Sequence, residues 1–162
     1  MIGLRDPGIE AIISSFRAAD IPWEGGRRLY RWWRAARNGR PFPSRADFTP
    51  RTMAPFLSTM VLHSVEPGAH PDYRLRLAGT EFHRWLGRDP TGLALDDLPN
   101  TAPLRARYDW IREHRIPYLC LNLPLDWSDK RFMTYSTLVL PLGEDPERVD
   151  MLIANLHFHA PS

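Results

Sequence analysis

The chain has 162 residues, of which 43% are hydrophobic and 25% charged, and its formal net charge is only +2. A chain of this length buries roughly two-thirds of its unfolded surface, so we expect one globular domain, and the small charge argues against nucleic-acid binding as the main task. No apolar run reaches the roughly eighteen residues of a membrane span, and the first residues lack a signal-peptide pattern, which together predict a cytoplasmic protein.

The first third of the chain is expected to be helical. We predict a helix near residues 8–19, and residues 24–38, EGGRRLYRWWRAARN, have the spacing of an amphipathic helix. Its apolar face is formed by Leu29, Trp32, Trp33 and Ala36. Arg27, Arg31 and Arg34 gather on the opposite face. The helix is expected to end at Gly39, and a proline-rich loop then leads to a short helix around residues 51–56.

Aromatic side chains on this amphipathic helix are candidate interaction residues. Tyr30, Trp32 and Trp33 are costly to leave in water, so the helix must pack on its own sheet or in a dimer. The arginine face could bind nucleic acid or an acidic protein, but a solvated helix face is the simpler interpretation. We therefore do not expect a nucleic-acid partner.

From residue 57 the pattern changes to that of strands. Residues 57–66 and 73–78 alternate apolar and polar side chains around a turn and predict an antiparallel hairpin. Short helical pieces and turns follow to about residue 99, and residues 103–115 can form one helix. The side chains of this helix that are expected to be buried are Leu104, Tyr108 and Ile111. Three further apolar runs, 116–125, 131–142 and 149–159, are separated by turns and predict three more strands.

This order of elements predicts an α+β fold. Three strands joined by short turns must be antiparallel, and the first hairpin completes a five-stranded sheet with helices covering one face. Such a sheet forms a half-open shell around a pocket. We expect residues 1–56 to be a helical extension and residues 57–162 the sheet domain, in one structural unit overall. The extension is too short to bury a core alone, so it should pack outside the sheet or in a dimer.

Several segments together resemble a PAS domain. "PSRADFTP", "YRLRLAGT", the aromatic helix EFHRWLG, "GRDPTG" and "LDDL" follow one another as in a family of small stand-alone PAS-type proteins common in alphaproteobacteria. The resemblance covers roughly residues 25–159. It implies a PAS-like fold and a sensor or interaction module rather than an enzyme. It also implies that the terminal helices contribute to a homodimer.

The resemblance and the strand pattern together suggest residues that could bind a small, unidentified ligand. They are Arg76, His83, Trp85, Tyr118, Asn122 and Tyr135. Arg76 either faces the covered side, where a ligand carboxylate or phosphate could neutralise it, or the outer side, where an acidic partner suffices. The faces of the remaining side chains depend on the strand register, which a one-residue shift would reverse.

The identity of any cofactor stays open. PAS relatives that bind haem use a histidine from the region of His83 or His114, but isolated histidines are usually surface residues, and we do not expect haem. We do not expect a covalent flavin adduct either, because the only cysteine, Cys120, lies on a predicted strand, where it serves as a small buried hydrophobe. This single cysteine also excludes internal disulfides and a CxxC zinc site.

A metal site and a catalytic site are further alternatives. His157 and His159 share one face of the last strand, and His63 or Glu66 would have to supply a third metal ligand, so we expect no metal. Three functions stay open at this point. The chain could be a ligand sensor that signals through protein contacts, or a ligand-free adaptor. It could also be a small enzyme, although we do not expect one, with a polar pocket around His63, Tyr135, Asn155 and His157.

Overall fold

A computed structural model describes residues 5–128 and 133–159 of the chain. Within these residues five strands form one antiparallel sheet in the order β2-β1-β5-β4-β3. The strands are β1 (Met60–Glu66), β2 (Asp72–Ala78), β3 (Tyr118–Pro124), β4 (Thr134–Leu142) and β5 (Met151–His159). The predicted α+β fold with a five-stranded antiparallel sheet is therefore confirmed. The run predicted at 131–142 begins with two residues, 131 and 132, that lie outside the described part.

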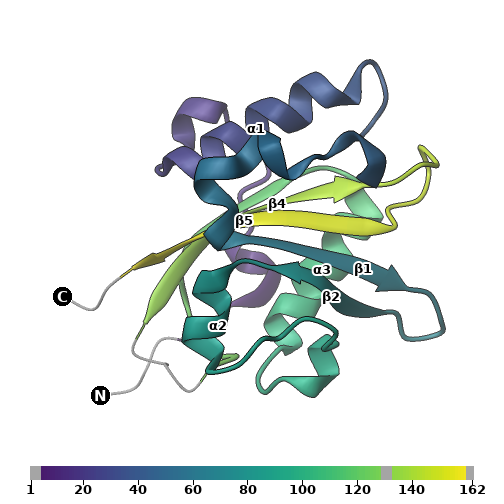
Figure 1. The fold of residues 1–162 in the computed structure, drawn as a ribbon. Coiled ribbons are helices and arrows are strands. Elements are labelled where there is room, and N and C mark those ends of the chain that lie inside the picture. The colour runs from purple at the N-terminus through teal and green to yellow at the C-terminus, as the bar shows by residue number, and fades with distance from the viewer. Residues whose placement is uncertain (1–4, 129–132, 160–162) are drawn as a thin grey trace.

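Helices lie on both sides of this sheet. The α-helices are α1 (Glu24–Arg37), α2 (Thr80–Leu86) and α3 (Ala102–His114). Short 3-10 helices are η1 (Gly8–Ala11), η2 (Ala18–Asp20), η3 (Arg45–Asp47), η4 (Pro50–Thr59) and η5 (Leu95–Asp97). Figure 1 shows α1 on one side of the sheet and α2 and α3 on the other. Among the described residues, no helix is long and apolar enough to cross a bilayer.

Strand pairing defines the two faces of the sheet. Leu138 pairs with Asn155 and Leu140 with Ile153, and these side chains face α1 on what we call the outer face. Residues with the opposite parity form the inner face, beneath α2 and α3, because successive side chains of a strand point to opposite sides. On β4 and β5 the inner face includes Tyr135, Thr137, Val139 and Leu156.

The helix α1 packs on the outer face of its own sheet. Leu29 and Trp33 are buried there, and the indole Nε1 of Trp33 donates a hydrogen bond to the carbonyl of Pro141 at 2.9 Å. The helix ends at Arg37, and its C-cap Asn38, with a left-handed φ of +49°, lies one residue before the predicted stop. One hydrophobic core includes residues from both the predicted extension, 1–56, and the predicted sheet domain, 57–162, for example Leu29 together with Ile153.

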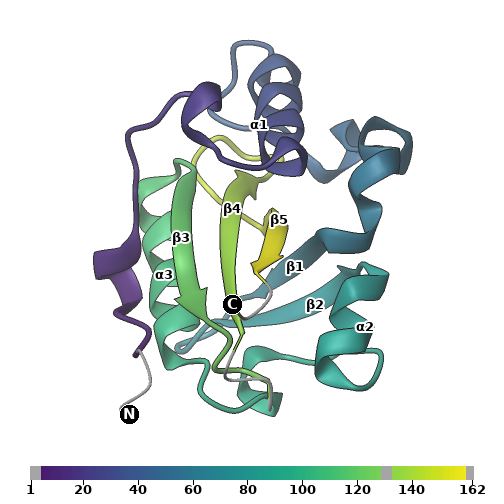
Figure 2. The same ribbon diagram turned by 90° about the vertical axis from the view of Figure 1, so that its left-hand side faces the viewer.

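The single helix predicted near residues 8–19 is wrong. Only η1 and η2 are helical there, and the segment between them is extended and pairs Ile13 with Leu119 at the edge of β3. Figure 2 shows this N-terminal segment running beside β3 and α3 before the chain reaches α1. A short isolated helix is marginal in water, whereas the strand edge offers hydrogen-bond partners to the extended backbone.

Candidate functional site

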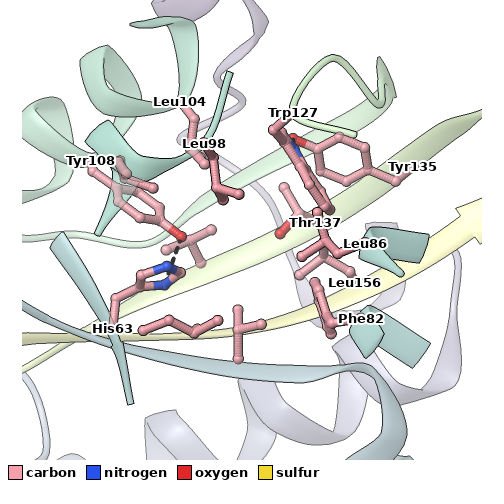
Figure 3. A pocket seen from close by; sticks show the side chains of 14 residues that line it. His63, Phe82, Leu86, Leu98, Leu104, Tyr108, Trp127, Tyr135, Thr137 and Leu156 are labelled. Carbon is pink, nitrogen blue, oxygen red and sulfur yellow. Dashed lines mark hydrogen bonds between the residues drawn. The ribbon is translucent and has the colours of Figure 1, made fainter. Parts of the chain in front are cut away.

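A small cavity lies between the inner face of the sheet and the helical segments α2, η5 and α3. Its volume is about 60 Å³, and most of its lining is aliphatic or aromatic, contributed by strands β1, β2, β4 and β5 and by the covering segments. Figure 3 shows His63 and Tyr108 at one end, and Phe82 and Trp127 at the other. An apolar cavity of about 150 Å³ holds benzene, so this one accommodates only very small molecules unless side chains move.

The first polar feature of the cavity is a buried His–Tyr pair. The hydroxyl of Tyr108, on α3, lies 3.2 Å from Nδ1 of His63, on β1, and the two rings meet edge to face. Burial lowers the pKa of His63 to about 4, although the charge of Asp72 opposes this shift. The imidazole is therefore neutral near pH 7, and burial also raises the pKa of Tyr108, which stays protonated.

A second polar pair lies at the other end of the cavity. Nε1 of Trp127 donates a hydrogen bond to the hydroxyl of Tyr135 at 3.3 Å, and burial raises the pKa of Tyr135 to about 12. Phe82 of α2 stacks on the Trp127 ring with centroids 6.3 Å apart. Thr137 adds one more hydroxyl to the lining. The lining thus combines an apolar wall with a few neutral hydrogen-bonding groups, as small-molecule sites do.

The structure separates the six predicted ligand residues. Tyr135 lines the cavity. Tyr118 is fully buried and pairs with Val139 across the strands, but it lies outside the cavity, and its hydroxyl has no hydrogen-bond partner among the described residues. Trp85 is half-buried on α2 and packs against Phe158 with centroids 5.8 Å apart. Of these three residues, only Tyr135 therefore contacts the space that a ligand could enter.

The other three predicted ligand residues lie away from the cavity. Arg76 is exposed, and its Nε donates to Ser64 Oγ at 2.8 Å on the outer side of the hairpin. His83 points to solvent, 3.4 Å from Asp89. Asn122 is exposed at a bulge of β3, with a φ of +57°. The cavity described here therefore includes none of them, because strand parity and helix rotation turn them outward.

Sequence reasoning did not assign several lining residues to a ligand pocket. Tyr108 is predicted only to be buried, His63 is a candidate only in the metal and enzyme alternatives, and no sequence pattern assigns Phe82, Trp127 or Thr137 to a pocket. The alternation of β4 contained a usable signal. Once Tyr135 faces the pocket, Thr137 and Val139 must do so as well, because side chains two residues apart share a face.

The histidines and acids of the metal alternative do not converge. His157 stacks on Trp23, and His159 Nε2 lies 2.9 Å from the hydroxyl of Ser136. Glu66 pairs with Arg74, and His63 faces the opposite side of the sheet. Within residues 5–128 and 133–159 no group of three or more His, Cys, Asp or Glu side chains is placed to hold a metal ion.

The haem and enzyme alternatives can be compared with the same geometry. His114 is exposed and stacks on Trp110, so neither it nor His83 lines the cavity, and a haem does not fit in about 60 Å³. Cys120 is buried on β3, as expected, and burial raises the pKa of its thiol to about 12. The four residues of the enzyme alternative do not form one site, because His63 and Tyr135 face the cavity whereas Asn155 and His157 face outward.

The predicted interaction residues have partners within this chain. Trp33 is buried against the sheet, and Tyr30 stacks on it with ring centroids 6.4 Å apart. Trp32 is half-buried and meets Phe48 edge to face at 5.3 Å. The first of the two packing options, docking of the helix on its own sheet, is therefore the arrangement observed.

Comparison with known proteins gives one family. The sequence model of a family described as PAS domain matches residues 23–156. No curated protein and no solved structure shows significant similarity to the chain. The match begins at the residue before α1 and includes all five strands of the sheet, except the last three residues of β5.

Proposed function

Since the chain belongs to the PAS domain family, whose members are generally sensory or interaction modules, we propose that it is a sensor for a small neutral molecule. The ligand occupies the cavity on the inner face of the sheet. The observation that carries this proposal is the His63–Tyr108 pair, which brings a polar group to one end of a mostly apolar space. This is a binding function and not a catalytic one.

The chemistry of the lining supports a neutral ligand. Among the residues that the structure describes, no carboxylate, lysine or arginine side chain contributes to it, and His63 is uncharged near pH 7. A charged ligand would lose its hydration without gaining an ionic partner, which is costly in an apolar site. A small apolar molecule with one hydrogen-bonding group therefore suits the cavity best. A larger ligand would have to displace α2, which carries Phe82 and Leu86 into the lining.

The signal is proposed to leave through protein contacts on the outer face. β1 and β5 line the cavity with Val61 and Leu156, and β5 also packs against α1 and η4. A shift of these strands would therefore move α1, whose exposed arginines and half-buried aromatics are available to a partner protein or to a second copy. A homodimer is part of this proposal.

A ligand-free adaptor is the second candidate. The small volume of the cavity favours the adaptor. Small-molecule sites usually leave about 300 Å³ or more open, whereas here side chains fill most of that space. In that case the same sheet would only support the interaction surfaces. The two candidates differ in whether any molecule enters the cavity.

Xenon binding followed by methyl NMR would test the sensor proposal. We expect xenon to shift the methyl resonances of lining residues such as Val139 and Leu156, since dry apolar cavities bind xenon. Val61→Phe should abolish the shifts by filling the space. Val65→Phe is the matched control, because Val65 lies on the same strand outside the lining. Native mass spectrometry of the freshly purified chain would then detect a resident ligand as additional non-covalent mass.

The outcomes separate the two candidates. Shifts confined to lining methyls, together with a co-purified mass, support a sensor. Xenon shifts that are absent, or equal in the wild type and in Val61→Phe, would refute the cavity as a binding site and favour the adaptor.

A further inference from the structure

The N-terminal arm, which we define as residues 6–13, lies outside the residues that match the PAS family. It precedes the match at residue 23 and runs beside β3 and α3 (Figure 2). The arm is joined to the rest of the chain through Ser14 and Ser15, which are both exposed. Its polar contacts with the body occur at its two ends, and between them η1 packs against α3 and β3.

The first end of the arm is held by a buried ion pair. Arg107 on α3 has no exposed side-chain surface, and its guanidinium donates to both oxygens of Asp6, at 2.5 and 2.8 Å. It also donates to the carbonyl of Gly8 at 3.3 Å. A buried guanidinium without a carboxylate is strongly unfavourable. The body of the protein therefore needs a carboxylate at this position, and the arm supplies it.

The second end of the arm adds a short piece of strand to the sheet. The N–H of Ile13 donates to the carbonyl of Leu119 at 2.8 Å, and the N–H of Leu119 donates to the carbonyl of Ile13 at 2.9 Å. β3 is an edge strand, and its free backbone groups are a template for pairing with any extended segment. This contact depends on backbone groups and not on which chain provides them.

Apolar side chains remain exposed on both sides of this contact. They are Ile9 and Ile13 on the arm and Ile116 and Leu121 on the body, each between 37% and 53% exposed. The arm in its own chain leaves them in water. Ile13 and Leu121 line one surface hollow together, and a second molecule approaching the same edge would cover them. Exposed apolar surface of this kind is typical of association surfaces.

We propose that two copies of the chain dimerise by exchanging their N-terminal arms. In the dimer, Asp6 of each copy pairs with Arg107 of the other, and Ile13 of each pairs with Leu119 of the other. All contacts of the arm are preserved, because none involves the link at Ser14 and Ser15, and the exposed isoleucines and Leu121 become covered. Exchange of an identical segment costs little, since the same contacts form in both states. This inference does not depend on a ligand in the cavity.

A disulfide between the arm and β3 distinguishes the two arrangements. Ile13 and Leu119 are a hydrogen-bonded antiparallel pair, with a Cα separation of about 5.5 Å that a disulfide spans. The full chain would carry Ile13→Cys and Leu119→Cys in a Cys120→Ala background. The protein is oxidised at concentrations from about 10 µM to 1 mM, the range in which the arm of a second copy can compete with the chain's own arm. The products are then separated by non-reducing gel electrophoresis. Leu119→Cys alone, in the same background, gives the level of random cross-linking.

We expect dimers linked by two disulfides. Their fraction should rise with protein concentration and exceed the cross-linked fraction of the Leu119→Cys control at least tenfold. Intramolecular disulfides alone at every concentration would overturn the proposal, even if the chain is then found to be a dimer. Should the cysteine variants fail to fold, light scattering of the otherwise unmodified chain decides. Leu121→Ser should then raise the dimer dissociation constant at least tenfold, because Leu121 is exposed in the single chain and becomes covered only in the dimer. An unchanged constant or a monomer throughout refutes arm exchange.

Discussion

Trp23 donates its indole N–H to Oδ1 of Asn155 at 2.8 Å, which joins the residue before α1 to the centre of the sheet. Asn155 is fully buried on the outer face of β5. On its other side, its amide Nδ2 lies 3.3 Å from the carbonyl of Phe56 and 3.1 Å from the hydroxyl of Thr59, both in η4. One buried amide thus connects α1, β5 and the segment that leads into β1, which also lines the cavity.

Replacing Asn155 by leucine should destabilise the protein by about 2 to 4 kcal/mol. The substitution keeps the size of the side chain but leaves the buried Trp23 N–H without an acceptor and removes the amide donor to the Phe56 carbonyl and the Thr59 hydroxyl, which costs more than the bonds themselves contribute. Urea denaturation measures the change. Trp23→Phe removes only one donor and should cost about 1 kcal/mol less than Asn155→Leu. Equal stability of Asn155→Leu and the wild type would show that the amide is not a structural centre.

Gly25→Ala should destabilise the protein although alanine is the better helix former. A Cβ at this position would lie 2.6 Å from Oδ1 of Asn155 and 3.2 Å from the Phe56 ring, so α1 would have to move away from the sheet. Overpacking of this kind costs about 1 to 3 kcal/mol, whereas helix propensity alone favours alanine by about 1 kcal/mol. Ala35→Gly, at an exposed position of the same helix, is the control for propensity. A stabilised Gly25→Ala protein would contradict this close approach.

The stability of the fold should fall as the pH decreases from about 6.5 to about 4. Burial lowers the pKa of His63 from 6.5 to about 4, so the unfolded chain binds a proton in this range that the folded protein does not. Above pH 6.5 the neutral, buried His63 therefore contributes about 3 kcal/mol to the free energy of unfolding, and this contribution is lost as the pH falls toward 4. Thermal unfolding at several pH values measures the slope.

His63→Phe should remove most of this slope. The lowered pKa values of Asp47 and Glu66 act mainly below about pH 5, because their ordinary values are 3.8 and 4.5. The pKa of His159 is also lowered, through burial and the neighbouring His157, so His159→Gln is the matched control and should leave most of the slope in place. A slope that persists in His63→Phe would mean that the buried histidine is not its source.

Continuous periodic patterns located most of the secondary structure. The segment 24–38 corresponds to α1 at Glu24–Arg37, and 103–115 corresponds to α3 at Ala102–His114, because each has an unbroken apolar face. The segment 149–159 contains β5 at Met151–His159, because it is one mostly apolar run that begins after a turn. The division of the chain at residue 56 stays a prediction.

Which face of a strand meets the cavity could not be derived in the same way. Alternation fixes which residues share a face but not which face is covered, and Arg76 and Tyr135 were therefore equally plausible ligand residues. In β3 the bulge between Cys120 and Leu123, with Asn122 at positive φ, interrupts the alternation. The contact between Asp6 and Arg107 joins residues 101 positions apart and has no local pattern at all.

The buried ion pair of the arm should be far more sensitive to the loss of one partner than to the loss of both. Asp6→Asn leaves the guanidinium of Arg107 buried without a charged partner, which costs about 3 kcal/mol or more. Arg107→Met in the same chain removes that charge, so the double variant should be more stable than Asp6→Asn alone. Urea denaturation of both single variants and the double variant gives the coupling energy. Additive effects of the two substitutions would show that the carboxylate and the guanidinium do not depend on each other.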